Sequence, residues 1–288
     1  MSIRSSIPVQ PMTTQLGVFI SKIASKDFHI NENPDQFNSI KESHRDEYHL
    51  FLLQEKGTTT IEIDFNQYII DPETIIFIHQ NQVHRFMDFE NATVSIWAIS
   101  NEILNSEYLK LLEDITPAHT LILQKDTFEV ILEAVSLCLK LAERKDEKLY
   151  RSLFTGSSVI LTGLVISQYL IQSKPTDKLS RFEIVTKSFK KLLERNFVTV
   201  KSPKEYATKL NISTPYLNEC IKKATGHSVS HHIQQRVILE AQRLLYYSEK
   251  SVKEIATELG YNDYQYFSRL FTKVAGMSAL EFRKKNLD

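Results

Sequence analysis

Cysteine and glycine are scarce in this chain of 288 residues, which contains two cysteines and seven glycines. Cys138 and Cys220 both fall in apolar helical patterns, so they provide neither a disulfide framework nor the CxxC spacing of a zinc site. The few glycines form no phosphate-cradling loop. The N-terminus lacks the apolar run of a signal peptide, and the longest apolar stretch, Val159–Ile171, is too short to span a bilayer. We therefore expect a cytoplasmic protein with no membrane partner and no cofactor.

Net charge is absent as well, because 35 basic residues balance 35 acidic ones. The two halves of the chain nevertheless carry net charges of opposite sign. Residues 180–288 carry 19 basic and 11 acidic side chains, whereas residues 1–179 carry 16 and 24. A basic C-terminal half favours a nucleic-acid partner. The polar segment 172–178, which contains proline, lies between the halves. We predict two domains, residues 1–172 and residues 180–288.

The C-terminal half contains the same short pattern twice. Residues 202–205 and 251–254 each begin with Ser and carry Glu three positions later, which is the pattern of a helix-capping box. Each is followed by an apolar face, a tight turn, a second helix and a closing glycine, Gly226 or Gly276. We expect Ser213 and Asn262 to cap these second helices, and the buried side of the later one to carry Tyr266, Phe267, Leu270 and Phe271. A small bundle of capped helices is the alternative for either unit alone, but the repeat disfavours it. We predict two helix-turn-helix motifs in an all-α domain.

One long helix is predicted between the two units, over Val229–Ser248. Its length of roughly 30 Å is close to one turn of DNA, about 34 Å. The outward faces of the units carry side chains of the types that hydrogen-bond to base edges or contact phosphate. We expect contacts with double-stranded DNA from Thr214, Pro215, Asn218, Glu219 and Lys222 in the first unit, and from Tyr264, Gln265, Ser268, Arg269 and Lys273 in the second.

Short strands are predicted in the N-terminal half, over residues 16–20, 48–53, 59–65, 75–79 and 93–99. Turn-like pieces such as residues 55–57 separate them, and this spacing indicates an antiparallel sandwich or barrel. Helical stripes follow at residues 103–112, 128–141 and 149–171. The last two form a helical hairpin that can pack on the barrel and on a second copy of the chain. The predicted fold class is therefore α+β.

Four histidines, at positions 44, 49, 79 and 84, fall among these strands and can meet inside a barrel. A metal site would also need a carboxylate, for which Glu47 or Glu55 is available. The sequence contains no HxH pair here, so we expect no metal. The favoured interpretation is a small-molecule pocket lined by His44, Tyr48, His49, His84 and Trp97.

The C-terminal pattern resembles the AraC/XylS family of bacterial transcription regulators from about Phe182 to Lys285. The resemblance is carried by Ile255-Ala256, Gly260-Tyr261, Tyr266-Phe267-Ser268-Arg269-Leu270-Phe271, Gly276-Met277-Ser278 and Phe282-Arg283, and in the first unit by Ser213, Tyr216-Leu217, Lys222-Lys223 and Thr225-Gly226. Three positions depart from the family pattern: Ala279 replaces proline, Ile221 replaces phenylalanine, and Glu219 stands where a basic residue is common. The N-terminal half is similar to the cupin-type domain often attached to this family, with Asn81 in place of glycine.

The resemblance implies a sequence-specific transcription regulator, expected to be an activator, in which a cupin-like barrel senses a small-molecule effector or forms a homodimer. It implies promoter DNA and RNA polymerase as partners, and no enzymatic activity. In that family both outward helices enter adjacent major grooves. Two alternatives remain open: a metal-dependent cupin enzyme with a helical interaction tail, and a DNA-binding protein whose barrel only dimerises.

Overall fold

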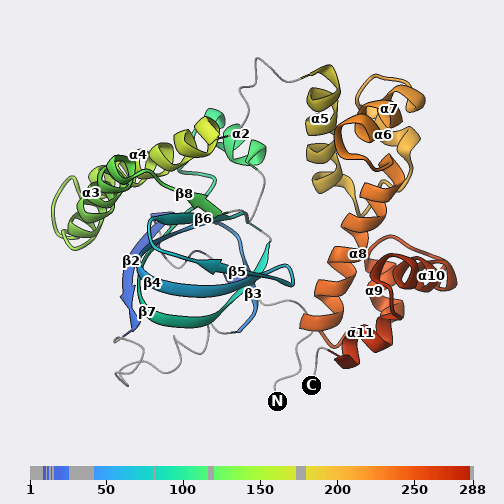
Figure 1. The fold of residues 1–288 in the computed structure, drawn as a ribbon, viewed down its shortest axis with the longest axis horizontal. Helices are drawn as coiled ribbons and strands as arrows, with labels where there is room; N and C mark the ends of the chain where they lie inside the picture. The colour runs from blue at the N-terminus through green and yellow to red at the C-terminus, as the bar shows by residue number, and fades with distance from the viewer. Residues whose placement is uncertain are drawn as a thin grey trace. The chain divides into compact units, whose positions relative to one another are not determined.

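Figure 1 presents the fold of a computed structural model, which describes residues 9–10, 12, 14, 16–25, 42–80, 82–115, 120–172 and 180–285. The chain divides into two compact units, one of residues Pro8–Ser173 and one that contains Lys174–Asp288. The first is built on a largely antiparallel sheet with helices, and the described part of the second is helical, so the fold class is α+β. Of the predicted linker only Gln172 is described, and Asn81 also lies outside the described residues.

Two long strands, β4 (His49–Ile63) and β7 (Val83–Ile99), form the centre of the sheet. Near one end β4 pairs with β6 (Thr74–Ile78), and near the other it pairs with β5 (Asn66–Ile70). In the same way β7 pairs with β3 (His44–Asp46) near its start and with β2 (Val18–Ala24) near its end. The short strands β1 (Val9–Gln10) and β8 (Thr120–Ile122) complete the sheet. Because both long strands change partners along their length, the sheet curls over itself (Figure 1).

The predicted turn at residues 55–57 is wrong, because these residues lie within β4. The two strands expected on either side of it are one continuous strand, whose register against β7 shifts between Gln54 and Lys56 and again between Lys56 and Thr58. Gly57 has φ of +61°, and a Cβ there would lie 2.3 Å from the carbonyl oxygen of Glu90. A glycine that looks like a turn signal thus forms a β-bulge that bends a long strand.

The two faces of the sheet contribute to two separate hydrophobic clusters. Phe51, Phe77 and Trp97 point to the face covered by α2 (Ser106–Asp114), α3 (Lys125–Ala142) and α4 (Tyr150–Gln172). Leu52 and Ile96 belong to the other cluster, which also contains Ile61, Ile63, Ile70, Ile76 and Phe86. Successive residues of a strand point to opposite faces, so neighbouring residues of β4 and β7 serve different clusters.

The predicted hairpin of residues 128–141 and 149–171 is confirmed as α3 and α4. Among the described residues, α4 is the helix whose length and composition would allow it to cross a membrane, and 44% of its most apolar window is buried. Its buried side chains include Phe154, Leu161 and Val165, which pack in the cluster shared with α3 and the sheet. These contacts are those of a core helix in a domain.

The C-terminal unit consists of α5 (Arg181–Asn196), α6 (Pro203–Lys209), α7 (Thr214–Thr225), α8 (Val229–Tyr247), α9 (Val252–Glu258), α10 (Tyr264–Ala275) and α11 (Ala279–Lys285). The long helix predicted between the repeats is confirmed as α8. In Figure 1 it passes from the α6–α7 pair to the α9–α10 pair. Its 19 residues correspond to about 29 Å. The helix α5 was not predicted, although Ser180 and Glu183 form a complete capping box at its start.

The helices of the two repeated units begin and end largely where the sequence predicts. Ser251 and Glu254 form a complete capping box, whereas at Ser202 the hydroxyl accepts from the Glu205 amide without the reciprocal bond. Gly226 and Gly276 end α7 and α10 in the left-handed conformation, with φ of 79° and 74°. The expected cap at Asn262 is wrong by one position, because the Asp263 carboxylate accepts from the Tyr266 amide at 3.0 Å.

Candidate nucleic-acid interface

The helix α7 buries one face and exposes the other. Leu217, Cys220 and Ile221 are buried against the rest of the first helix pair. Pro215, Glu219 and Lys222 are exposed on the opposite side, and Thr214 is half-buried at the first turn. Five of the side chains expected to contact DNA therefore lie on or beside one helix, but they differ in exposure and in the contacts that they make within the protein.

Asn218 is half-buried, and its side chain is engaged with the protein. Its amide nitrogen donates to the Thr214 carbonyl at 3.2 Å, and its amide oxygen accepts from the Val229 amide, the first residue of α8, at 3.4 Å. This geometry makes Asn218 a link between α7 and the start of α8. Glu219 pairs with Lys223 one helical turn later, at 2.7 Å, so its negative charge has a cationic neighbour on the same exposed face.

The helix α10 presents a more open polar face. It buries Phe267, Leu270 and Phe271, while Tyr264, Gln265, Arg269 and Lys273 are exposed and Ser268 is half-buried. The expectation that Tyr266 is buried is wrong. Its side chain is 47% exposed and its ring stacks on that of Tyr261 at 6.0 Å between centroids. Tyr266 is thus an aromatic surface residue that helical periodicity assigned to the wrong face.

A polar cavity of about 350 Å³ lies between α8 and α10. Lys273 and Val274 line it from α10, and the start of α8 supplies Ser228, Ser230, His231, Gln234 and Gln235. Residues with hydroxyl, amide and imidazole side chains thus line the cavity together with Lys273. Such groups offer hydrogen bonds to an anionic partner beside the exposed face of α10.

The two helix pairs are joined by a second contact in addition to α8. Gly260, in the turn between α9 and α10, has φ of 78°, and a Cβ there would lie 2.3 Å from the carbonyl oxygen of Val198. The Lys201 ammonium lies 4.9 Å from the centre of the Tyr261 ring and donates to the Phe197 carbonyl. Burial lowers the pKa of Lys201 to about 8. Two connections between the pairs restrict their relative orientation more than a single helix would.

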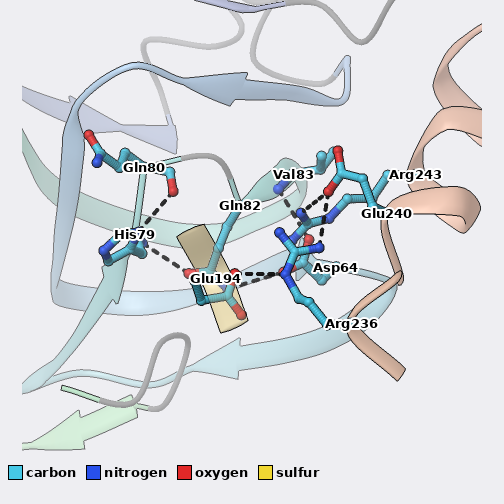
Figure 2. A network of polar contacts seen from close by, with 9 residues as sticks. All are labelled: Asp64, His79, Gln80, Gln82, Val83, Glu194, Arg236, Glu240 and Arg243. Atoms are coloured by element: carbon cyan, nitrogen blue, oxygen red, sulfur yellow. Dashed lines mark hydrogen bonds and ion pairs between the residues drawn. The ribbon is translucent and has the colours of Figure 1, made fainter. Parts of the chain in front are cut away.

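An ionic network also fastens α8 to α5, and Figure 2 draws it. Arg236 donates to Glu194 at 2.7 Å and to Glu240 at 3.2 Å, and Arg243 donates to Glu240 at 2.8 Å. The Arg236 guanidinium also lies 3.8 Å from the centre of the Phe197 ring. The C-terminal end of α8 is held by Arg283, which donates to the carbonyls of Leu245 and Ser248. The helix that spaces the two pairs is therefore anchored along its length.

The side chains expected to line a ligand pocket do not come together. Strand register places His44, His84 and Tyr48 with the cluster of Leu52 and Ile96, whereas His49 and Trp97 point to the face covered by helices. Trp97 is 1% exposed and stacks on Phe51 at 5.2 Å. The reason for the division is the alternation of side chains along a strand. A single pocket of these five residues is a wrong expectation.

His49 belongs to a polar group at the start of β4. Its Nε2 atom lies 3.0 Å from the Asn101 amide oxygen, and the Asn101 amide donates to the Gln80 side chain at 3.1 Å. The His79 ring lies 5.1 Å from that of His49. Burial, together with the neighbouring His79, lowers the pKa of His49 to about 4. His49 is therefore a neutral, buried imidazole near neutral pH.

His44 and His84 do meet, as cross-strand partners of β3 and β7, with 4.5 Å between ring centroids. The carboxylate beside them is that of Asp46, and the expectation of Glu47 or Glu55 is wrong. Glu47 is exposed, and Glu55 pairs with Lys22 and accepts from Ser95. All three clustered side chains are buried, and their potential ligand atoms lie within 4.8 Å of one another. The HxD spacing on one strand was the signal for Asp46, because residues two apart share a face.

Burial decides the ionisation of this cluster. It lowers the pKa of His84 to about 3 and also lowers that of His44. It raises the pKa of Asp46 to about 7, and the nearby Tyr48 hydroxyl opposes part of that rise. Within the described part of the chain neither Asp46 oxygen has a partner at hydrogen-bonding distance and angle, although the Tyr48 hydroxyl is close enough to act on the pKa of the carboxyl. No hydrogen bond from the described residues therefore offsets the free-energy cost of burying the charged form of Asp46.

Comparison with known proteins bears on the C-terminal unit. Residues 206–285 match the model of a helix-turn-helix domain family. The msm operon regulatory protein of Streptococcus mutans is 30% identical over 120 residues, covering 40% of this chain and 43% of that protein. The transcriptional activator RhaR of Escherichia coli is 30% identical over 99 residues, covering 33% and 35%. Residues 206–285 are an AraC-type helix-turn-helix domain. The chain thus spans less than half the length of the curated relatives it matches, and both relatives are transcription regulators.

Solved structures with similarity to the chain fall into two groups. The C-terminal domain of AraT, a response regulator from Geobacillus stearothermophilus, is 29% identical and covers 37% of this chain and 88% of that one, with a TM-score of 0.34. ToxT from Vibrio cholerae is 14% identical and covers 93% and 97%, with a TM-score of 0.39. The AraC-type domain contains every residue expected to contact DNA, from Thr214 to Lys273.

Proposed function

We propose that the chain is a cytoplasmic, sequence-specific transcription regulator whose residues 180–288 bind double-stranded DNA through two helix-turn-helix motifs, α6–α7 and α9–α10. The observation that carries the proposal is the two-sided character of α10. It buries three aromatic or aliphatic side chains and exposes Gln265, Arg269 and Lys273 within an AraC-type domain. A helix that is anchored on one face and polar on the other is suited to enter a major groove.

The spacing of the two pairs supports simultaneous binding to successive grooves of one duplex. The connecting helix α8 is about 29 Å long, which approaches the repeat of about 34 Å of B-form DNA. The contact of Gly260 with Val198 and of Lys201 with Tyr261 limits rotation of one pair against the other. A nearly fixed spacing favours operators with a defined separation between two half-sites.

We assign different roles to the exposed residues. Arg269 and Gln265 are able to form bidentate hydrogen bonds with guanine and adenine, and Lys222 and Lys273 neutralise phosphates. Thr214, Pro215, Tyr264 and Ser268 lie at the first turns or along the same faces. Asn218 holds the start of α8, so we place it in a positioning role. The Glu219–Lys223 pair makes the first unit less cationic, and we expect it to contribute less affinity than the second.

We further propose that residues 1–172 form a cupin-like barrel domain that senses a small-molecule effector or mediates dimerisation. The hairpin of α3 and α4 supports the dimer, because it exposes large apolar side chains on both helices. These include Val130 and Leu137 of α3, and Leu153, Ile160 and Ile171 of α4. An exposed apolar face of this kind is typical of a surface that packs against another chain.

We propose that regulation is activation and involves RNA polymerase at the promoter. The support is that one relative, RhaR, is a transcriptional activator by name. A reporter fused to a promoter bound by the protein tests the sign of regulation. Deletion of the gene should lower its expression, and raised expression on deletion would identify a repressor instead.

Selection of binding sites from random duplexes, followed by titration of the preferred site, tests DNA binding directly. Arg269→Ala should weaken binding by roughly 1–3 kcal/mol and relax one base position. Lys273→Ala should weaken binding to all sequences alike and reduce the salt dependence by about one phosphate contact. Arg144→Ala removes the same charge from an exposed position between α3 and α4 and serves as the control. Failure to enrich any sequence, with the protein folded, would refute the proposal.

A further inference from the structure

The cluster of His44, Asp46 and His84 has no role in the proposed DNA-binding function. It lies in the N-terminal unit, on β3 and the start of β7, and its side chains are 1–5% exposed. The Nε2 atom of His44 is 3.7 Å from one carboxylate oxygen of Asp46, and that of His84 is 3.5 Å from the other. Two nitrogen atoms and a carboxylate thus converge on one buried point.

The orientation of the two imidazoles shows which nitrogen atoms face that point. Nδ1 of His44 lies 2.8 Å from the carbonyl oxygen of Glu42, and Nδ1 of His84 lies 3.3 Å from that of Gln82. A carbonyl oxygen only accepts, so both Nδ1 atoms carry the proton and both neutral rings direct the lone pair of Nε2 toward Asp46. Hydrogen bonds of this kind, from the far nitrogen to a backbone carbonyl, orient histidines that bind metal ions.

The loop that provides one of these carbonyls is itself held in place, as Figure 2 shows. The Gln82 side chain donates to Asp64 at 3.2 Å, and the Val83 amide donates to the other oxygen of Asp64 at 3.2 Å. The Gln82 side-chain oxygen accepts from the His79 amide at 2.9 Å. The position of His84 at the start of β7 is therefore fixed by contacts outside the cluster.

The converging atoms lack a donor that would satisfy them. Among the described residues, neither oxygen of Asp46 nor Nε2 of His84 has a hydrogen-bond partner, and all three atoms are buried. Two lone pairs and a carboxylate that face one another repel, and a cation bound between them removes that repulsion. The distances of 3.5 and 3.7 Å exceed the 2.8 and 3.3 Å of the hydrogen bonds made by the two Nδ1 atoms, so neither Nε2 shares a proton with the carboxylate at the usual length. The two distances, one to each oxygen of Asp46, are near the roughly 3.4 Å between ligands placed about 2.0–2.1 Å from a tetrahedral zinc ion, and the three ligand atoms lie within 4.8 Å of one another.

We propose that His44, Asp46 and His84 bind a divalent first-row transition-metal ion that joins β3 to β7. Two imidazole nitrogens and one carboxylate oxygen, without sulfur, suit Zn²⁺, Fe²⁺, Co²⁺, Ni²⁺ or Mn²⁺ rather than Cu⁺. The absence of an HxH pair had argued against a metal, but Asp46 occupies the position two residues after His44 and supplies the third ligand. The ion makes the stability of the barrel depend on metal concentration.

Titration of the full-length protein with Zn²⁺ and Co²⁺, after removal of bound metal with EDTA, tests the proposal. A competing chromophoric chelator gives the affinity, and elemental analysis of the dialysed protein gives the stoichiometry. We expect one equivalent per chain and, with Co²⁺, a visible absorption spectrum of nitrogen and oxygen coordination. Less than about a tenth of an equivalent of either ion in the folded protein would overturn the proposal.

Matched variants locate the ion. Asp46→Asn removes the buried charge with little change of shape, and both it and His84→Gln should weaken binding by about 100-fold or more. Glu47→Gln removes a neighbouring carboxylate that is exposed, and His227→Gln removes an exposed histidine of the other unit. Both controls should bind within about threefold of the unchanged protein. Equal binding by Asp46→Asn, or loss of binding in His227→Gln, would show an adventitious ion only and refute the assignment.

The result of the metal-binding test does not depend on whether the proposed DNA-binding function is correct. The cluster and the helix pairs belong to different units of the chain, so titration of DNA in EDTA measures one and titration of metal without DNA measures the other. Fluorescence of Trp97, the single tryptophan, reports whether each variant keeps a folded barrel. If His84→Gln does not fold, the wild-type stoichiometry and Asp46→Asn still decide the question.

Discussion

Gly260→Ala tests whether the turn between α9 and α10 holds the two helix pairs together. Gly260 and Gly276 have nearly the same backbone conformation, with φ of 78° and 74°. A Cβ at Gly260 would lie 2.3 Å from the carbonyl oxygen of Val198, whereas a Cβ at Gly276 would meet no atom of the described residues within 4 Å. Alanine at either position costs about 1–2 kcal/mol for the left-handed conformation. At Gly260 the collision with backbone adds about 1–3 kcal/mol, as for an overpacked site.

Urea unfolding followed by circular dichroism at 222 nm measures this difference, because the C-terminal unit is helical, while Trp97 fluorescence reports the sheet separately. We expect the free energy of unfolding to fall by about 2–5 kcal/mol for Gly260→Ala and by about 1–2 kcal/mol for Gly276→Ala. The first variant should also lose affinity for a two-site operator relative to a single half-site. Equal destabilisation by both variants would refute the idea that Val198 fixes this turn.

Three further predictions concern charge. Glu240→Ala should lower the free energy of unfolding by about 3–5 kcal/mol, because the buried guanidinium groups of Arg236 and Arg243 lose the acceptor that they share. Glu194→Ala should lower it by less than about 1 kcal/mol, because Glu194 is exposed. His49→Gln should remove about 3 kcal/mol of pH dependence in urea unfolding followed by Trp97 fluorescence. Its pKa of about 4 means that only the unfolded state binds its proton between pH 6.5 and 4, so stability falls as the pH falls. An unchanged pH profile would contradict this. DNA affinity should fall more for Lys273→Ala than for Lys222→Ala, and the reverse order would contradict the smaller role given to the first unit.

The helical C-terminal half was largely predictable from its sequence. Ser251, Gly226 and Gly276 act through hydrogen bonds and backbone angles within three or four residues, so the boundaries of α7, α9 and α10 follow from local chemistry. The cap at Asp263 rather than Asn262 differs by a single residue, because both side chains are able to accept from the helix amides.

The surface of that half was less predictable. Periodicity places Tyr266 beside Phe267 on the apolar side, but α10 packs against α8 and α9 and buries Phe267, Leu270 and Phe271, while Tyr266 stays exposed. Asn218 is of a residue type that can hydrogen-bond to base edges, yet its side-chain oxygen accepts from the amide of Val229, eleven positions away. Contacts at that range depend on how one helix crosses another, and residue spacing within a helix carries no information about it.

The sequence alone determined the order of a β-rich and a helical half, the repeated helix boundaries and the opposite charges of the two halves, because each depends on residues close in the chain or on composition. Tertiary structure alone decided that Gly57 bends a strand, that Trp97 and His84 face opposite sides of the sheet, and that Asp46 completes a cluster with two histidines. The physical reason is strand pairing. Register between β3, β4 and β7 brings together residues separated by as many as 50 positions and assigns each to a face, and one bulge is enough to change that assignment.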